Sequence, residues 1–325
     1  MRRRGFIALI GGAASWPLVG RAQQGAMPVI GFLNGGTMKG YAPFVEAWRV
    51  GLRQTGFIEG QNVTIQYRYA DGDPARSAGF INEFIRLPSA VIVISGGDAA
   101  ARQVKAITRS IPIVSTFGSD PVETGIVQKI NQPGANITGV SVFAAQLVEK
   151  RLELARALVG NSRIAYLIDP NNPNSKADRA GMSAAAGKFA QDYAVLRAST
   201  DAECDALFIS LPKADAKALI VESAPFFNGK VEQLVRLATQ NRIATVFPRR
   251  EFTAAGGLTS YGSNLPEAYR QLGIYTGRIL KGDKPADLPI VMPSRFEMVV
   301  NLKTANALGI AVPTDILLRA DEVIE

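Results

Sequence analysis

The sequence contains no histidine and a single cysteine, Cys204, and these two absences remove whole classes of chemistry. Without histidine, neither a Ser-His-Asp nor a Cys-His catalytic arrangement can form, and a zinc site of the usual Cys/His type is excluded. One thiol cannot make an internal disulfide, so Cys204 is interpreted as a buried structural residue. We therefore expect no metal and no cofactor, and acid–base catalysis would have to use carboxylates.

Nucleotide-binding motifs are also missing. GFLNGGT has glycines at the spacing of a phosphate-binding loop, but Thr37 and Met38 stand where Lys and Ser/Thr are required. No G-x-G-x-x-G follows a predicted strand and opens a helix. Ser210 and Lys213 form an S-x-x-K pattern that has no S-D-N or K-T-G partner. The sequence therefore predicts neither a nucleotide site nor a serine acyl-enzyme.

The basic excess of the chain is partly local. It has 36 basic and 28 acidic residues, a formal charge of +8. Four arginines and no acid lie in the first 22 residues, so the rest of the chain carries +4. Because no basic run interleaved with aromatic residues occurs, we do not expect nucleic acid as a partner.

The first residues, MRRRGFIALIGGAASWPLVGRAQQ, combine a basic start, an apolar middle and small residues near Ala22. This layout is typical of an export signal, and the Arg3-Arg4 pair with its flanking residues resembles a twin-arginine signal. The apolar run contains Gly11, Gly12 and Pro17 and is shorter than the roughly 20 residues of a spanning helix. We expect residues 1–22 to be a cleaved export signal. The mature chain would then be a soluble periplasmic protein, without stable membrane insertion, in a Gram-negative bacterium.

From Met27 onward, short apolar strands alternate with helices. One set of strands is predicted at PVIGFL, NVTIQYRYA, AVIVIS and IPIVSTF, and a second at RIAYLID, AVLRA, DALFIS, ALIVES and IATVF. This alternation predicts an α/β fold with two doubly wound, Rossmann-like lobes built on parallel sheets. We expect lobe 1 to comprise residues 27–143 plus about 256–287, and lobe 2 residues 146–250 plus about 288–325. Three crossings of the chain would form a three-strand hinge between them.

Polar clusters follow many of the predicted strands. In a doubly wound sheet these positions lie at the carboxyl edge, so two facing edges would converge on one interlobe cleft. The clusters are Asn34–Thr37, Ser95–Asp98, Gly118–Pro121, Asp169–Asn174, Pro225–Asn228, Arg249–Phe252 and Ser260–Gly262.

Individual residues in these clusters allow two interpretations. Asp98, Asp120, Asp169 and Glu251 lie either at ligand contacts or at helix caps and turns. The asparagines between Asp169 and Asn174 are turn formers or contacts to a ligand or hinge. The consecutive Phe226 and Phe227 cannot both face the core from one helix start, so either one of them lines a cleft wall or a surface, or both are partly buried in packing.

A run of segments carries a resemblance to a known family. It includes VIGFLNGG, GLRQTGFIEGQNVTIQYRYADGD, SGGDAAA, GSDPVETGIV, PGANITGVS, KRLELARALV, PNNPN, PFFN, REFTAAGGLTSYG, AYRQLGIYTGRILKGDKPADLPI and NLKTANALGI. Over essentially the whole mature chain, the sequence resembles the substrate-binding proteins of ABC transporters, within their tryptophan/tyrosine-type group. The resemblance implies a type I periplasmic-binding fold that closes on a small solute, often an amino acid. It also implies delivery of that solute to an inner-membrane permease with its ATPase.

The resemblance also implies where the ligand is held. Family ligand contacts come from strand-end loops, and the matching positions here are Asn34, Gly35, Ser95, Gly96, Gly97, Ser119, Asp120, Asn172, Asn174, Phe227, Asn228, Arg250, Glu251 and Tyr261. One position departs from the family pattern, because Ala224 stands where an acidic residue often precedes Pro-Phe-Phe. Either Asp120 or Glu251 would replace that acid, or the ligand is not an ordinary α-amino acid.

We therefore predict a monomeric solute-binding protein and not an enzyme. The Ser95–Asp98 turn would receive a ligand carboxylate through Ser95 Oγ and backbone N–H groups. A ligand sensor for a membrane receptor would use the same fold and stays an alternative. A hydrolase that uses only carboxylates is the enzyme alternative. A transcriptional regulator is disfavoured because no helix-turn-helix precedes PVIGFL.

Overall fold

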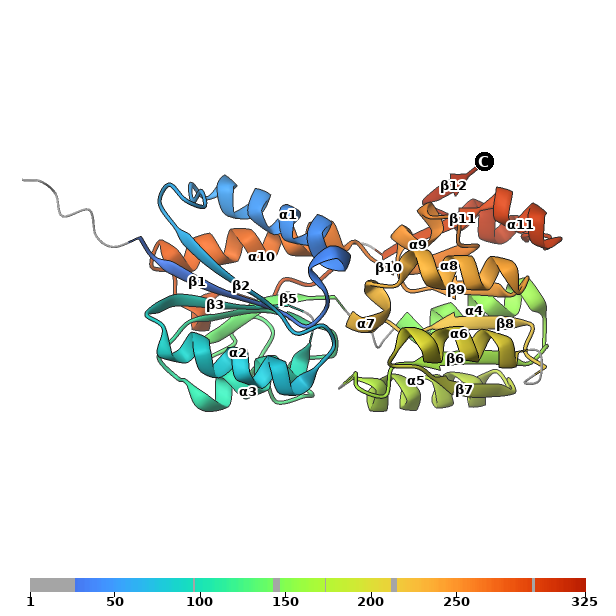
Figure 1. The fold of residues 1–325 in the computed structure, drawn as a ribbon, viewed down its shortest axis with the longest axis horizontal. Helices are drawn as coiled ribbons and strands as arrows, with labels where there is room; N and C mark the ends of the chain where they lie inside the picture. The colour runs from blue at the N-terminus through green and yellow to red at the C-terminus, as the bar shows by residue number, and fades with distance from the viewer. Residues whose placement is uncertain (1–26, 96, 143–146, 173, 212–214, 294–295) are drawn as a thin grey trace, which may run out of the picture.

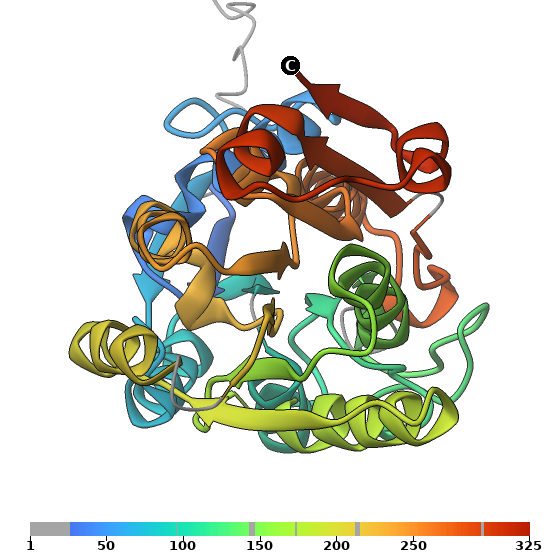
Figure 2. The ribbon, with the colours of Figure 1, turned by 90° about the vertical axis from the view of Figure 1, so that its right-hand side faces the viewer.

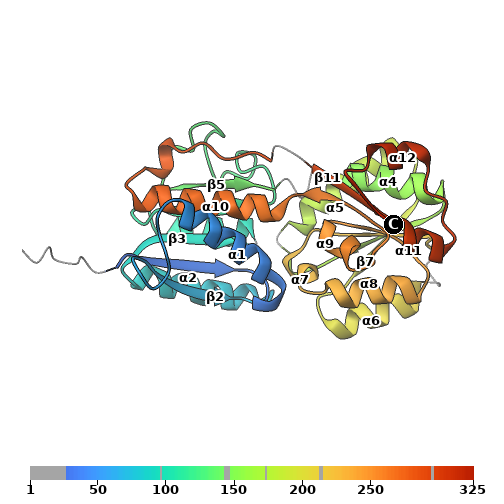
Figure 3. The same cartoon turned by 90° about the horizontal axis from the view of Figure 1, so that it is seen from above.

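The computed structural model describes residues 27–325 except 96, 143–146, 173, 212–214 and 294–295. Two α/β lobes lie side by side along the long axis of the molecule (Figures 1 and 3). The expected class, α/β with two lobes, is confirmed. The export signal expected at residues 1–22 lies outside the described residues. Among the residues that are described, no helix is long and apolar enough to cross a membrane.

The first lobe is built on a parallel five-stranded sheet in the order β2-β1-β3-β4-β5. Its strands are short and strongly apolar, as expected for strands covered on both faces. Their bounds are β1 Val29–Asn34, β2 Thr64–Tyr69, β3 Ser89–Ser95, β4 Ile113–Phe117 and β5 Ile137–Ser141. In the register of β1 and β3, Asn34 is paired with Ser95, so two predicted site residues end side by side.

Helices cover both faces of this sheet. Helices α2 (Pro74–Arg86) and α3 (Asp98–Ile107) pack on one face, and α1 (Met38–Gln54) and α10 (Leu265–Leu280) pack on the other, followed by the 3-10 turn η3 (Pro285–Asp287). The backbones of α1 and α10 touch, because a Cβ on Gly51 would lie 1.9 Å from the carbonyl oxygen of Arg270 and one on Gly273 2.0 Å from that of Trp48. The indole of Trp48 donates to Thr276 Oγ1 across the same contact, at 3.2 Å.

The second lobe is built on a seven-stranded sheet in the order β12-β11-β10-β9-β8-β6-β7. All neighbouring pairs are parallel except β10 and β11. Figure 2, seen from the side of the second lobe, shows this sheet running from the C-terminal strands to β7 with helices on both sides. The strand bounds are β6 Ile164–Ile168, β7 Tyr193–Arg197, β8 Ala218–Val221, β9 Ala244–Phe247, β10 Thr259–Ser263, β11 Phe296–Asn301 and β12 Glu322–Ile324.

The helices of the second lobe fall into two groups. One apolar cluster joins one face of the sheet to α4 (Val148–Val159), α5 (Ser175–Lys188), α11 (Leu302–Leu308) and α12 (Thr314–Arg319). The other joins the opposite face to α6 (Asp201–Ser210), α7 (Pro225–Asn228), α8 (Val231–Gln240) and α9 (Arg250–Ala254). Figure 1 shows α7 at the side of the second lobe that faces the first.

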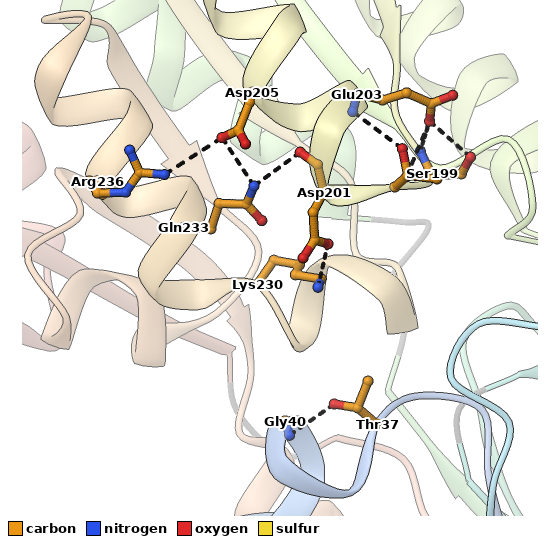
Figure 4. Close-up of polar contacts among 10 residues, drawn as sticks. Thr37, Gly40, Ser199, Asp201, Glu203, Asp205, Lys230, Gln233 and Arg236 are labelled. Carbon is orange, nitrogen blue, oxygen red and sulfur yellow. Dashed lines mark hydrogen bonds and ion pairs between the residues drawn. The ribbon is translucent and has the colours of Figure 1, made fainter.

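One predicted strand is wrong, because DALFIS forms the second half of helix α6. A capping box between Thr200 and Glu203 starts this helix, and its polar face is tied to α8. Figure 4 shows Asp201 paired with Lys230, and Gln233 donating to Asp205 Oδ1 at 3.1 Å. Its strand-like apolar run is short, and periodicity alone cannot separate such a run from a buried helix segment.

The segments after β9 correct the expected lobe boundaries. We expected about 256–287 in lobe 1, but β10 pairs with β9 and β11 in the second sheet, and the return to the first lobe occurs only at α10. We expected about 288–325 in lobe 2, but Leu288 and Ile290 pack in first-lobe clusters and Val291 bridges to Val140 of β5. The chain passes between the sheets three times: after β5, between β10 and α10, and between Val291 and β11. Apolar alternation identifies a strand but does not say which sheet it joins.

Candidate functional site

Two adjoining cavities lie where the carboxyl edges of the two sheets meet. The first, here called the aromatic cavity, measures about 530 Å³ including its solvent-open part and is lined by Tyr41, Gly97, Thr116, Gly118, Val142, Asn172, Asn174, Ser223, Pro225, Asn228, Leu265 and Tyr269. The second, the polar cavity, measures about 610 Å³ on the same basis and is lined by Leu33, Gly35, Ala70, Gly72, Asp73, Pro74, Ser77, Ser95, Gly97, Ala99, Ala100, Gln103, Asp169, Asn171, Asn172 and Pro225. They share Gly97, Asn172 and Pro225.

A buried hydrogen-bond chain forms the floor of the first-lobe side. Asn34 Nδ2 donates to Ser95 Oγ at 2.6 Å, and Ser95 Oγ lies 2.6 Å from Tyr269 Oη. The side-chain oxygen of Asn34, Oδ1, accepts from Gly36 N at 2.7 Å. Burial raises the pKa of Tyr269 well above its ordinary value, so its hydroxyl stays protonated. Asn34 therefore lies behind Ser95, and it lines neither cavity.

Asp98, at the start of α3, organises the loop that follows β4. Its carboxylate is fully buried and accepts from Gly118 N at 2.9 Å and from Ser119 N at 3.0 Å. Burial raises the pKa of Asp98, and these hydrogen bonds oppose the rise. Asp120 Oδ1 accepts from Val122 N at 2.7 Å and so caps the next turn. Neither Ser119 nor Asp120 lines the two cavities.

The second lobe supplies the loop from Asp169 to Asn174. Asp169 Oδ1 accepts from Asn171 N at 2.9 Å, and Asn172 Oδ1 accepts from Asn174 N at 3.2 Å. The amide nitrogen of Asn172 is buried and has no hydrogen-bond partner among the described residues. Asn172 lines both cavities and Asn174 the aromatic one.

A pair of buried carboxyl groups holds this loop from below. Glu222 Oε2 accepts from Asp169 N at 2.8 Å, and its other oxygen accepts from Ser175 Oγ. Burial, reinforced by the neighbouring Asp178, raises the pKa of Glu222 to about 8. Burial also raises the pKa of Asp178 to about 6, with the buried Arg151 acting in the opposite direction. The pair supports the loop and does not line the cavities.

Helix α7 brings one of its two predicted residues to the cavity. Phe227 is fully buried in the core of the second lobe, so its predicted role in the cleft wall is wrong. Phe226 is the partly exposed member of the pair and packs against that core. Asn228 lines the aromatic cavity, and its Nδ2 donates to Tyr41 Oη of the first lobe at 2.7 Å. Its buried Oδ1 has no hydrogen-bond partner in the part of the chain that the structure describes.

The loop after β9 contacts the first lobe through a residue that is not among the predicted ligand contacts. The buried Arg249 lies with its Cζ 5.0 Å from the centre of the Phe44 ring, across the lobes. It lines a third hollow together with Asn228 and the predicted Glu251. Its Nη1 lies 3.7 Å from Glu251 Oε2.

Two other predicted residues lie away from all three of these hollows. Arg250 pairs with Glu322 at 2.6 Å on an exposed part of the second lobe. The ring of Tyr261 packs on that of Phe296, with centroids 6.3 Å apart. The Tyr261 carbonyl accepts from Arg151 Nε at 2.8 Å. Successive residues on a strand or helix start point in different directions, so nearness in sequence to a strand-end loop did not place these side chains in the cleft.

Two residues of the site, Tyr41 and Tyr269, were not predicted from the sequence. Both are almost fully buried, both line the aromatic cavity, and their ring centroids lie 6.3 Å apart. Each lies near the start of its helix, so the first turns of α1 and α10 reach the same sheet edge as the loops. Gly35, Ser95 and Gly97 were predicted and do line the cavities. Gly96 lies outside the described residues.

Comparison with known proteins identifies the family. The profile described as "ABC transporter substrate binding protein" matches residues 36–324. The chain belongs to this family. Its members bind substrates and are not enzymes, so this substrate-binding protein is not an enzyme either. The family also implies a small-molecule ligand, a permease and ATPase as partners, and an extracellular or periplasmic location.

A curated relative and two solved structures are similar to this substrate-binding protein. The "Tyrosine-binding protein" of Clostridioides difficile is 26% identical over 268 residues, covering 79% of this chain and 74% of the relative. An ABC domain in complex with L-Trp from Streptococcus pneumonia has a TM-score of 0.79 at 24% identity. A conserved domain protein from Vibrio cholerae has a TM-score of 0.81 at 23% identity. Each structure matches over 91% of this chain and 99% of its own, and both support the two-lobed type I periplasmic-binding fold.

Proposed function

We propose that this protein is the periplasmic solute-binding component of an ABC import system in a Gram-negative bacterium. It captures a small carboxylate-bearing ligand, of the aromatic amino-acid type, between its two lobes. One observation carries the proposal: two joined cavities are lined by residues from both lobes. Some of the side chains that line them contain buried polar atoms with no hydrogen-bond partner among the described residues.

The aromatic cavity suits the apolar part of such a ligand. Tyr41 and Tyr269 offer two ring surfaces, while Val142, Pro225 and Leu265 add apolar walls. Aromatic rings gain about 0.5–1.5 kcal/mol from offset or edge-on contacts beyond the burial of their area. The relatives described as binding tyrosine and L-Trp agree with this chemistry.

The polar cavity suits the charged end of the ligand. On the first-lobe side it is lined by Gly35, Ser95 and Gly97, beside the N-terminus of α3. Backbone N–H groups at a helix start and a hydroxyl are donors that a carboxylate accepts well. Ser95 Oγ keeps capacity for a ligand contact, because a hydroxyl has one donor and two acceptor positions.

Ligand binding stabilises the closed arrangement of the lobes. The hydrogen bond from Asn228 to Tyr41 and the contact of Arg249 with Phe44 both join the two lobes. A ligand that touches both lobes gains its full set of contacts only when these surfaces meet, so it shifts the population toward closure. A permease would then read the closed form of a monomer through its lobe surfaces.

The test is identification of the ligand by mass spectrometry after denaturing the purified protein, followed by calorimetry with the recovered compound. A true ligand raises the melting temperature by mass action. Ser95→Ala should weaken binding of a carboxylate ligand by about tenfold or more, because hydrogen bonds to charged groups are the stronger ones. Ser89→Ala, at the opposite end of β3, is the matched control. Unchanged affinity in Ser95→Ala would show that the carboxylate is bound elsewhere, and a chemically altered ligand would contradict a pure carrier.

A further inference from the structure

We propose that Asp169 is the residue that binds the ammonium group of the ligand, so that the polar cavity selects a zwitterionic α-amino acid. This inference rests on the proposed function, because it assigns the second charged end of the same ligand. The juxtaposition that carries it is a buried carboxylate on the second lobe, in the cavity whose opposite side holds Ser95 and Gly97.

Asp169 is a buried acid without a basic partner. Only 3% of the residue is exposed, and its one hydrogen-bond donor in the described structure is the backbone N–H of Asn171. Among the described residues, none of the ion pairs involves it. Burial raises the pKa of Asp169, and the hydrogen bond from Asn171 N–H lowers it in part. No lysine or arginine contributes to lowering it. A buried carboxylate without a cation is costly, and a cationic group from a ligand would remove that cost.

The backbone of Asp169 is held rigidly, so the carboxylate is presented at a fixed place. Its N–H donates to Glu222 Oε2 at 2.8 Å, its carbonyl accepts from Asn172 N at 3.0 Å, and the same carbonyl lies 2.6 Å from Ser175 Oγ. Groups fixed before binding lose less conformational entropy when the ligand arrives. The loop is therefore preorganised.

The unpartnered amide nitrogen of Asn172 gives a second, independent indication of a ligand at this place. Asn172 is 7% exposed, lines both cavities, and already uses its oxygen for Asn174 N. Its free N–H groups are donors, suited to a ligand carboxylate rather than to an ammonium. Asp169 and Asn172 thus present an acceptor and a donor next to each other, which is the pattern that a zwitterion requires.

The other acids near the cleft are already engaged. Asp73 also lines the polar cavity, but it is exposed and its Oδ1 caps α2 by accepting from Ala75 N at 2.7 Å. Asp120 caps a turn outside the cavities, and Glu251 lies in the hollow beside Arg249. The acid that Ala224 does not provide is therefore supplied from the end of β6, and neither Asp120 nor Glu251 replaces it.

The geometry also orients the ligand. The carboxylate lies toward Ser95 and Gly97, the ammonium toward Asp169, and the side chain passes Gly97, Asn172 and Pro225 into the aromatic cavity. The two cavities share these three residues, so a single amino acid can occupy both at once.

The experiment uses the full chain and matched ligand pairs in calorimetry. Each pair compares an amino acid (L-tyrosine, L-tryptophan or L-phenylalanine) with the propanoate that lacks its amino group. The wild-type protein should bind the amino acid at least about tenfold more tightly. Asp169→Asn should remove that preference and leave the affinity for the propanoate within about threefold. Asp315→Asn, a surface substitution on α12, is the control that should leave both affinities unchanged.

Each other outcome overturns the proposal in a distinct way. If Asp169→Asn weakens both members of a pair equally, Asp169 only supports the loop. If the wild-type protein prefers the propanoate, the cavity does not recognise an ammonium, while the proposed carboxylate binding stands. If it binds no member of any pair, the proposed function fails as well. The wild-type comparison decides the matter even if Asp169→Asn does not fold, which circular dichroism would show.

Discussion

Glycine-to-alanine substitution should have opposite effects on stability at two helical glycines. Gly51 lies in the close contact of α1 and α10, whereas Gly79 of α2 has open space around it. In Gly51→Ala, the new Cβ would lie 1.9 Å from the carbonyl oxygen of Arg270, whereas ordinary contacts begin at 3.4 Å. The two backbones would have to separate by about 1.5 Å, because neither side of the contact is a flexible side-chain end. In Gly79→Ala, within the exposed face of α2, the new methyl meets nothing within 4 Å.

The size of each effect follows from two opposing contributions. Replacing glycine by alanine inside a helix stabilises it by about 1 kcal/mol. Because no other contribution opposes it, Gly79→Ala should raise the free energy of unfolding by this amount. Overpacking a tight contact costs about 3 kcal/mol, so Gly51→Ala should lose about 2 kcal/mol net. For a chain of this size, that corresponds to a fall in melting temperature of about 4 °C.

Trp48 is a convenient reporter for this measurement. The chain has two tryptophans, and the other is Trp16 in the expected export signal. Trp48 is fully buried in the α1–α10 contact, so its fluorescence follows the loss of this packing during urea unfolding. If Gly51→Ala is as stable as Gly79→Ala, the two helices do not approach as closely as described. Because α1 carries Tyr41 and α10 carries Tyr269, Gly51→Ala should also weaken ligand binding.

Three further predictions concern buried polar groups. Glu222 has an ordinary pKa of 4.5 that burial raises to about 8, so the folded protein binds the extra proton and stability falls as pH rises between these values. Glu222→Gln should reduce the difference in unfolding free energy between pH 5 and pH 8, measured by urea unfolding. An unchanged difference would contradict the raised pKa of Glu222. Burial raises the pKa of Cys204 to about 12, so a thiol reagent should label it only after denaturation; rapid labelling of the native protein would refute this. Tyr41→Phe removes the hydroxyl that accepts from Asn228, so small-angle scattering should show a larger radius of gyration without ligand, while an unchanged radius would mean that this bond does not hold the lobes together.

Most of the fold could be predicted because parallel strands buried on both faces leave a strong signal. The segment at β3 is continuously apolar and ends in a glycine-containing polar turn, and it forms a strand there. Residues 201–210 were predicted wrongly, since a short apolar run fits both a strand and a buried helix. The spacing of Thr200 and Glu203, which form a capping box in the structure, is the sequence signal that favours a helix. The sheet that β10 joins depends on contacts far apart in sequence, which a local pattern does not contain.

The candidate site was predictable only in part, for a similar reason. Ser95, Gly97 and Asn172 were expected at the cleft because they lie at or after the ends of strands, and they do line the cavities. The direction of each side chain depends on backbone geometry, so Phe227 points into the core instead of the cleft. Tyr269 reaches the site from a helix that returns to the first lobe more than a hundred residues after β5, and only the folded chain brings it next to Ser95.

The late return of α10 constrains how this protein can be made. Its residues complete the apolar layer around Trp48 and Leu52, so that layer stays open on the ribosome until residues 265–280 have emerged. The first lobe therefore cannot complete its folding during synthesis before the second lobe has been made. It can do so only in the last quarter of translation. Truncations placed at the apparent boundary after β5 should yield aggregating fragments, whereas joining the α10 segment to that boundary offers a route to an independently folding first lobe.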